Sequence, residues 1–149
     1  MFYVFIVYSI TAEVWAGRMD KTELVYGNIV NRNVILGLLL YIVGSFEQHR
    51  AHKTLASLRK KPADTVYGIP KGGLFNYVWS PHYLGEILIY ISFLVVSGGQ
   101  LISLWLITTF VIITLANQAW STKQWYLKRA DVRNNTQLKA RYALVPYIF

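Results

Sequence analysis

Four apolar segments alternate with polar and charged stretches along this chain of 149 residues. They run from Phe2 to Ala16, Val34 to Phe46, Tyr83 to Val96 and Leu101 to Ala116. Each is shorter than the roughly 20 residues that a spanning helix needs, so each must extend into its flanking turns. Their number and their charged or glycine-rich separators favour four membrane helices over one soluble core. We therefore expect an all-α membrane protein with about four transmembrane helices.

The segments that follow the second and third apolar runs differ in kind. After Phe46, the stretch EQHRAHKTLASLRKK keeps Ala51, Leu55 and Leu58 on a helical stripe, so the second helix is predicted to continue beyond the lipid. Pro62 then ends this helix. The third and fourth apolar segments are joined by SGGQ, which predicts a tight, uncharged turn.

The amino-acid composition agrees with a membrane protein and excludes chemistry that depends on cysteine. Hydrophobic residues make up 54% of the chain and aromatic residues 15%, which is too apolar for an ordinary soluble domain. The absence of cysteine excludes disulfides, thiolate metal sites and a cysteine nucleophile. The N-terminus has no basic residues before its apolar run, which argues against a cleaved signal peptide.

The basic residues predict an orientation in the membrane. Of the 15 Lys and Arg residues, three lie in the loop after the first apolar segment, six in residues 47–82, none in SGGQ and six in the tail. Because positive loops stay in the cytosol, the middle segment and the C-terminal tail are predicted to be cytosolic, and SGGQ to face the opposite side. The net charge of +8 could serve anionic lipid, nucleic acid or an anionic cofactor. Nucleic acid is disfavoured because the basic residues are tied to helix ends.

Two interpretations of the basic segments remain open. They could simply attract acidic lipid. They could also hold a phosphate-bearing cofactor, because the loop YGIPKGG offers small residues for close backbone approach and a nearby Lys71. The chain has no G-x-G-x-x-G or Walker motif, so neither a Rossmann nor a P-loop domain is implied.

An acidic residue early in the third apolar helix adds a polar candidate. Tyr83, Glu86 and Tyr90 share one helical face, with His82 beside it. An ionised Glu is costly inside a bilayer, so Glu86 needs a partner, which could be a structural cation or a polar group of a ligand. Polar and aromatic residues between Asn117 and Tyr126 form either an interfacial belt or part of the same site.

Three histidines, His49, His52 and His82, invite a metal hypothesis. A membrane di-iron centre would need many more His and carboxylate ligands than these and Glu86 provide. We therefore expect no metal site.

Several motifs together resemble one known family. They are HKTLASLRKKP, YGIPKGGLFNYVWSPHYLGEILIY, QWYLKR and the terminal ARYALVPYIF, in this order. In these motifs the chain resembles the polyprenol reductase branch of the steroid 5α-reductase family, most strongly over residues 50–149. The resemblance implies one membrane domain over residues 1–149, corresponding to the C-terminal part of a larger multi-span reductase of the endoplasmic reticulum. Its catalytic residues are expected in N-terminal helices that this chain starts after, so no catalytic residue is assigned here.

The resemblance also implies NADPH as cofactor and suggests which residues bind it. Those on or beside the family's pocket positions, or placed to meet a phosphate, are Arg59, Tyr67, Lys71, Asn76, His82, Glu86, Lys123 and Tyr126. Gly68 and Pro81 favour the polyprenol branch. Departures from the steroid-reducing pattern are His82 in place of Asn, Gln48 and His52 in place of Asn and Asp, and Thr122 and Lys123 where a His is expected.

The implied function is NADPH-dependent reduction of the α-isoprene double bond of polyprenol or polyprenal toward dolichol. Such a reaction supports dolichol-linked glycan synthesis and protein N-glycosylation, with an isoprenoid lipid as substrate. Alternatives are a 3-oxo-5α-steroid 4-dehydrogenase-type or enoyl reductase, a membrane methyltransferase of the isoprenylcysteine type, and a non-catalytic membrane scaffold.

Overall fold

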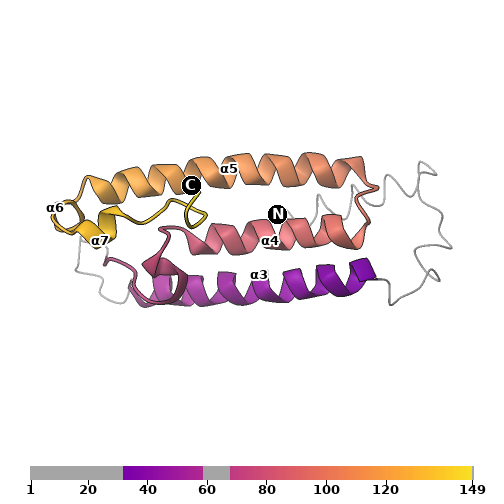
Figure 1. Ribbon diagram of the computed structural model, residues 1–149, viewed down its shortest axis with the longest axis horizontal. Coiled ribbons are helices and arrows are strands. Elements are labelled where there is room, and N and C mark those ends of the chain that lie inside the picture. The colour runs from indigo at the N-terminus through magenta and orange to yellow at the C-terminus, as the bar shows by residue number, and fades with distance from the viewer. Residues whose placement is uncertain (1–31, 59–67, 149) are drawn as a thin grey trace.

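Three long helices make up most of the structure. The computed structural model describes residues 32–58 and 68–148. The long helices are α3 (Arg32–Ser57), α4 (Pro81–Val96) and α5 (Ile102–Leu127), and α4 lies between the other two (Figure 1). Three short helical segments, η1 (Gly73–Asn76), α6 (Ala130–Arg133) and α7 (Thr136–Lys139), gather at one end of this bundle.

The helices follow the predicted apolar segments closely. The second, third and fourth segments form α3, α4 and α5, and α3 continues to Ser57 as predicted. The first segment and the predicted helix stop at Pro62 lie outside the described residues. The polar run from Asn117 to Tyr126 is still part of α5. An all-α architecture is thus confirmed for the residues that the structure describes.

One of these helices is suited by length and composition to cross a membrane. Among the described residues, only α5 is both long and apolar enough, and α4 is apolar but shorter. Large apolar side chains also point outward from α3 and α5, including Phe46, which is 63% exposed, and Leu106, which is 68% exposed. Outward-facing apolar side chains of this size suit a lipid environment. The four spans remain a prediction.

Glycines bring α3 and α4 into close contact. A Cβ added at Gly44 would lie 2.8 Å from the Gly85 carbonyl oxygen, and one added at Gly85 would lie 2.7 Å from the Gly44 carbonyl oxygen. Near the other end of the pair, a Cβ at Gly37 would lie 2.9 Å from the Ser92 carbonyl oxygen. Small residues of this kind let helix backbones approach closely where lipid gives no hydrophobic drive for association. The contact fixes the position of α3 against α4.

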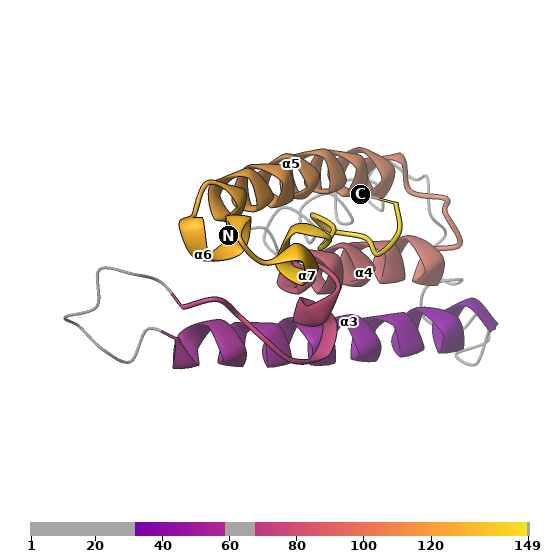
Figure 2. The ribbon, with the colours of Figure 1, turned by 60° about the vertical axis from the view of Figure 1, so that its left-hand side comes forward.

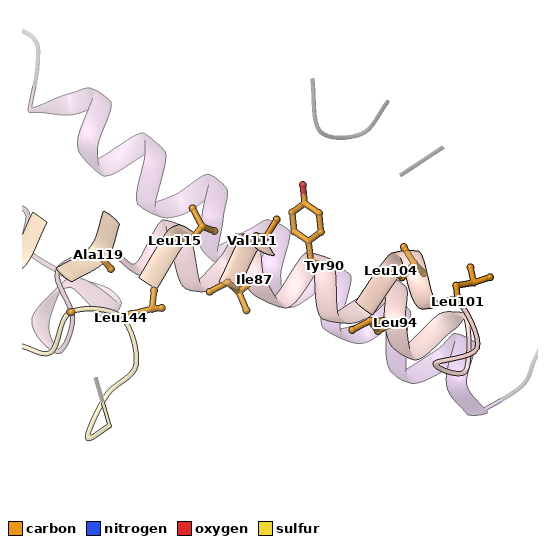
Figure 3. Packing of buried hydrophobic residues seen from close by; sticks show 10 residues of the cluster. Ile87, Tyr90, Leu94, Leu101, Leu104, Val111, Leu115, Ala119 and Leu144 are labelled. Carbon is orange, nitrogen blue, oxygen red and sulfur yellow. The ribbon is translucent and has the colours of Figure 1, made fainter. Parts of the chain in front are cut away.

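Larger apolar side chains join α4 to α5. Figure 3 shows their packing, which is continued by the returning tail through Leu144. The buried residues of this cluster are Ile87, Tyr90, Leu94, Leu101, Leu104, Val111, Leu115, Ala119, Ala143 and Leu144.

The turn between α4 and α5 is the tight connection that SGGQ predicts. Gly98 and Gly99 have φ values of 62° and 73°, a region that glycine adopts without strain. The Gly99 amide donates to the Leu94 carbonyl at 2.9 Å, and Trp105 Nε1 donates to the Gly99 carbonyl at 3.0 Å. The chain therefore reverses direction at Ser97 to Leu101, and α5 runs back along α4 (Figure 2).

The C-terminal tail is joined to the loop before α4. Val78 and Tyr142 form an isolated parallel bridge. The Trp79 amide donates to the Tyr142 carbonyl at 2.9 Å, and the Tyr142 amide donates to the Tyr77 carbonyl at 2.8 Å. Segments about 60 residues apart in sequence are thereby held side by side.

Candidate functional site

The end of the bundle that carries η1, α6 and α7 is the basic end (Figure 1). The end of α3, the loop before α4 and the tail after α5 all meet there, and the SGGQ turn lies at the opposite end. The structure thus brings the two basic segments to one end. The described basic residues of these segments are Arg50, Lys53, Lys71, Lys123, Lys128, Arg129, Arg133, Lys139 and Arg141.

Two cavities at this end share no lining residue. The first, which we name the lysine cavity, has a volume of about 210 Å³. Arg50 Nη2 lies 2.8 Å from Glu47 Oε2 in an ion pair on its wall. The lysine cavity is lined by Glu47, Arg50, Ala51, Thr54, Lys71, Gly72, Gly73, Leu74, Phe75 and Pro81.

The glycine-rich loop accommodates an arginine side chain of the protein itself. A Cβ added at Gly73 would lie 2.4 Å from Arg50 Nη2, so the space beside this glycine is already taken by the guanidinium. The Asn76 side chain accepts a hydrogen bond from the Gly72 amide at 3.0 Å and so stabilises the turn. Lys71 and Asn76 therefore belong to the lysine cavity and its turn rather than to the second cavity.

The second cavity, which we name the tyrosine cavity, has a volume of about 530 Å³. It lies between the end of α3 and the end of α5. Leu58 and Gly68, which line it, are the sequence neighbours of the predicted residues Arg59 and Tyr67, both of which lie outside the described residues. The full lining is Leu55, Leu58, Gly68, Ser121, Thr122, Trp125 and Tyr126.

Of the predicted site residues, Tyr126 lies in the tyrosine cavity and Lys123 lies on a neighbouring aromatic ring. Tyr126 is buried, with 7% of its surface exposed. The Lys123 Nζ atom is 5.7 Å from the centre of the Trp120 ring, a distance suited to a cation–π contact.

A run of buried polar atoms marks the start of α4. Trp79 Nε1, Ser80 Oγ and His82 Nδ1 are buried and have no hydrogen-bond partner within residues 32–58 and 68–148. Buried polar groups in native proteins are nearly always hydrogen-bonded, so three such atoms within four residues call for an explanation such as water or a ligand. Pro81 begins the helix, a position where its missing amide costs nothing, and this fixes the run at the helix start.

His82 is held as a neutral imidazole. Its ring centre lies 5.3 Å from that of His52 on α3 and 4.0 Å from that of Tyr83. His82 precedes the apolar run that starts at Tyr83. Burial, and to a smaller extent the neighbouring His52, lowers the pKa of His82 to about 4. At neutral pH this side chain is therefore a polar group without charge.

Glu86 lies one helical turn beyond His82 and is partly buried. In residues 32–58 and 68–148, its carboxylate has no ion-pair partner, since the two salt bridges there are Glu47–Arg50 and Asp131–Arg129. In this part of the chain, Glu86 is therefore not a salt-bridge residue. The same residues contain no group of three or more His, Asp or Glu side chains that could hold a metal ion.

Aromatic stacking fixes the wall of the tyrosine cavity. The Trp79 and Tyr126 rings are stacked, with centroids 4.3 Å apart and planes 13° apart. The Arg141 guanidinium lies 4.8 Å from the centre of the Trp79 ring, and its Nη1 donates to the Pro70 carbonyl at 3.0 Å. In the sequence, Arg141 is one of the six basic residues of the tail and part of the motif ARYALVPYIF, and Trp79 belongs to the motif before α4, but neither is a predicted site residue. A Trp inside the polar run WSPH was the one available signal.

Comparison with known proteins identifies the family. The whole chain, residues 1–149, matches the family described as 3-oxo-5-alpha-steroid 4-dehydrogenase. It is 39% identical over 113 residues to polyprenal reductase 1 of Oryza sativa subsp. indica, which covers 76% of this chain and 31% of that protein. It is 36% identical over 115 residues to polyprenal reductase 2 of Arabidopsis thaliana, covering 76% and 32%.

A human relative gives the same result. The chain is 35% identical over 119 residues to the polyprenal reductase of Homo sapiens, which covers 77% of this chain and 36% of that protein. The matched segment thus spans about a third of the length of these relatives. The predicted family and branch are confirmed: this chain belongs to the 3-oxo-5-alpha-steroid 4-dehydrogenase (steroid 5α-reductase) family and is similar to its polyprenal reductases.

Proposed function

We propose that the tyrosine cavity holds NADPH and that this chain takes part in reducing the α-isoprene double bond of a polyprenal toward dolichol. The observation that carries the proposal is this cavity of about 530 Å³ between α3 and α5, with Tyr126 in its wall. Its volume falls within the range of about 300–1,000 Å³ that is usual for cofactor and ligand sites. Arg129 lies 6.0 Å from the centre of the Tyr126 ring, so positive charge suited to a dinucleotide's phosphates is close by.

The polar groups at the start of α4 have matching roles in this proposal. Glu86 can accept a hydrogen bond from a ribose hydroxyl or an amide of the cofactor, since its carboxylate is not used by a described cation. The neutral His82 can hydrogen-bond a polar group without adding charge. Arg59, Tyr67 and Lys123 complete the proposed set, with Lys123 serving a phosphate. Lys71 and Asn76 are left out of this set, because Lys71 lines the lysine cavity and Asn76 accepts a hydrogen bond within the turn beside it.

The chemistry favours the aldehyde over the alcohol. NADPH, when bound, supplies a hydride, which is a nucleophile and requires an electron-poor carbon. The double bond of an allylic alcohol is not electron-poor, whereas that of a conjugated aldehyde is. The hydride goes to the β-carbon and a proton to the α-carbon, the carbonyl is kept, and NADPH is oxidised to NADP⁺. This chain's share is to bind and orient the reductant.

The proposed topology places this reaction at a membrane surface. We infer a single multi-pass domain of about four spans in the endoplasmic reticulum membrane, with the basic loop and the C-terminus cytosolic. A long isoprenoid then stays in the bilayer while its aldehyde reaches the basic end of the bundle. The product would feed dolichol-linked glycan synthesis and protein N-glycosylation. Reporter tags at SGGQ and at the C-terminus should lie in different compartments, and a shared compartment would refute the topology.

The decisive experiment measures cofactor binding and substrate preference on the purified chain in lipid nanodiscs. We expect NADPH to be retained and S-adenosylmethionine to be released. Retention of S-adenosylmethionine would instead support the isoprenylcysteine methyltransferase class, and retention of neither would support a scaffold. In a second assay, polyprenal and polyprenol are offered separately with NADPH. Rapid turnover of the alcohol without an oxidant would contradict the proposed hydride acceptor.

A further inference from the structure

Three side chains from distant parts of the chain meet behind the tyrosine cavity. They are Trp79 from the loop before α4, Tyr126 from the end of α5 and Arg141 from the tail. We propose that Arg141 and Trp79 are positioning residues that set the orientation of the Tyr126 ring for ligand binding. The ligand-binding part of this inference rests on the proposed function, whereas the orientation of the ring does not.

Tyr126 receives its orientation mainly from Trp79. The near-parallel stack, with centroids 4.3 Å apart, leaves the tyrosine ring little freedom to rotate about its side-chain bonds. Trp125 adds an edge contact at 4.8 Å, but 47% of its surface is exposed, so it is the weaker support. Tyr126 is thus a wall residue of the cavity whose position depends on a ring outside the cavity lining.

The Trp79 ring is in turn placed by stacking rather than by a hydrogen bond from its indole N–H group. A buried indole usually finds a partner for its N–H group. Trp79 is only 1% exposed, yet its Nε1 has no partner in the described part of the chain, while its ring contacts both Tyr126 and Arg141. The Trp79 ring therefore keeps its contacts with Tyr126 and Arg141, although its N–H group finds no acceptor among the described residues.

Arg141 holds the other side of this arrangement. It is 6% exposed, and in the described residues no carboxylate pairs with it. It contacts the Trp79 ring and donates to the Pro70 carbonyl, and its charge also acts on Tyr126. Burial lowers the pKa of Arg141, which reflects the loss of water around the guanidinium. A cation–π contact is strongest where the cation is desolvated, and the buried Arg141 guanidinium meets this condition at the Trp79 ring.

The backbone makes the arrangement a single unit. Backbone hydrogen bonds across the parallel bridge hold Trp79 beside Tyr142. Since Tyr142 directly follows Arg141, these bonds also keep Arg141 close to Trp79. The bond from Arg141 to Pro70 ties the same unit to the loop that leads toward the lysine cavity. A change at Arg141 is therefore transmitted to Tyr126 through Trp79, without Arg141 lining the tyrosine cavity.

The first test needs no cofactor. The full chain is labelled with ¹³C at its tyrosine rings, and the Tyr126 signals are assigned with a Tyr126→Phe variant. The Trp79 ring should shift the Tyr126 ring signals upfield in the wild type, and Arg141→Met should remove most of this shift. Arg133→Met is the matched control, because Arg133 is an exposed basic residue of the same tail. An unchanged Tyr126 shift in folded Arg141→Met would overturn the proposal. If Arg141→Met does not fold, Trp79→Phe and Arg141→Lys, which keep a ring and a cation, must still displace the shift partially.

The second test asks whether Arg141 acts through Tyr126. We expect Arg141→Met to weaken NADPH binding about tenfold, a reasonable size for a desolvated cation–π contact. The double variant Arg141→Met/Tyr126→Leu should bind no more weakly than Tyr126→Leu alone, because coupled residues are non-additive. Additive losses would mean that Arg141 contacts the ligand itself, which would overturn the positioning role. If the wild type binds no NADPH, the proposed function fails, and the tyrosine signals alone decide the positioning proposal.

Discussion

The lysine cavity and the tyrosine cavity lie at the same end of the bundle and share α3 as a wall, yet they are built from different chemistry. In the lysine cavity, Arg50 is paired with Glu47 at 2.8 Å, and its side chain is 45% exposed. Exposed pairs of this kind contribute little because water screens them. The tyrosine cavity is lined by apolar, aromatic and hydroxyl-bearing side chains. The nearby cations, Arg129 and Arg141, do not line it but contact the rings of Tyr126 and Trp79.

Under the proposed function, the charge of the glycine-rich loop lies in a different cavity from the one that holds the cofactor. Lys71 stands in the glycine-rich loop, and this loop packs around Arg50, which is paired with Glu47. Among the described residues, buried side-chain atoms without a hydrogen-bond partner are found at Trp79, Ser80 and His82, and also at Thr108 on α5. Unmet hydrogen-bonding capacity in buried positions points to a ligand more directly than solvated charge does.

The largest expected effect comes from the contact that holds α3 in place for both cavities. Gly85→Leu should lower the free energy of unfolding by about 3 kcal/mol, because overpacking at a helix contact forces backbone shifts. A Cβ there would lie 2.7 Å from the Gly44 carbonyl and 2.8 Å from the Gln48 amide nitrogen. Thermal unfolding in detergent measures the change. Ala56→Leu, on an exposed part of α3, is the control and should change little. Equal losses in the two variants would contradict the tight α3–α4 contact.

The next effect is a pH dependence of stability that comes from His82, which lines neither cavity. The pKa of His82 is lowered to about 4 by burial, so between pH 6.5 and 4 the unfolded state binds more protons than the folded state. Stability should therefore fall by about 3 kcal/mol as the pH drops through this window. His82→Asn should remove this part of the dependence, while His49→Asn, at an exposed position on α3, should not. Parallel pH profiles for the wild type and His82→Asn would show that His82 is not held neutral by burial.

A third prediction compares the two cavities directly. Tyr126→Leu should weaken NADPH binding by at least about tenfold, since the variant loses a stacked aromatic wall and its hydroxyl. Lys71→Gln should weaken it less than about twofold, because the lysine is solvated and lies in the other cavity. Titration of NADPH fluorescence in nanodiscs measures both. The reverse order of effects would place the cofactor in the lysine cavity.

The helices could be predicted from the sequence, but the grouping of the site residues could not. Apolar runs and the glycine turn at Ser97 to Gln100 located α3, α4 and α5, because these depend on local periodicity and backbone preference. The resemblance to the family singled out Tyr126, which lines the tyrosine cavity, but its role in cofactor binding stays a prediction. The separation of Lys71 from Tyr126 and the stacking of Trp79 with Arg141 depend on how the tail returns to the loop. That return follows from the bridge between Val78 and Tyr142, for which the sequence contains no periodic signal.

The smallest expected effect is a difference in stability between alanine variants at two glycines, one of which, Gly73, lines the lysine cavity. Gly73 and Gly98 both have positive φ values, 54° and 62°, so alanine should cost about 1–2 kcal/mol at either position from backbone strain alone. A Cβ at Gly73 would also lie against Arg50, whereas at Gly98 the nearest atom would be 3.7 Å away. Gly73→Ala should therefore destabilise the protein more than Gly98→Ala, by a margin that chemical denaturation can measure. In an Arg50→Ala background, Gly73→Ala should lower the free energy of unfolding by no more than Gly98→Ala does. If the margin persists without Arg50, the glycine serves a role other than making room for this guanidinium, and the lysine cavity is open to a ligand after all.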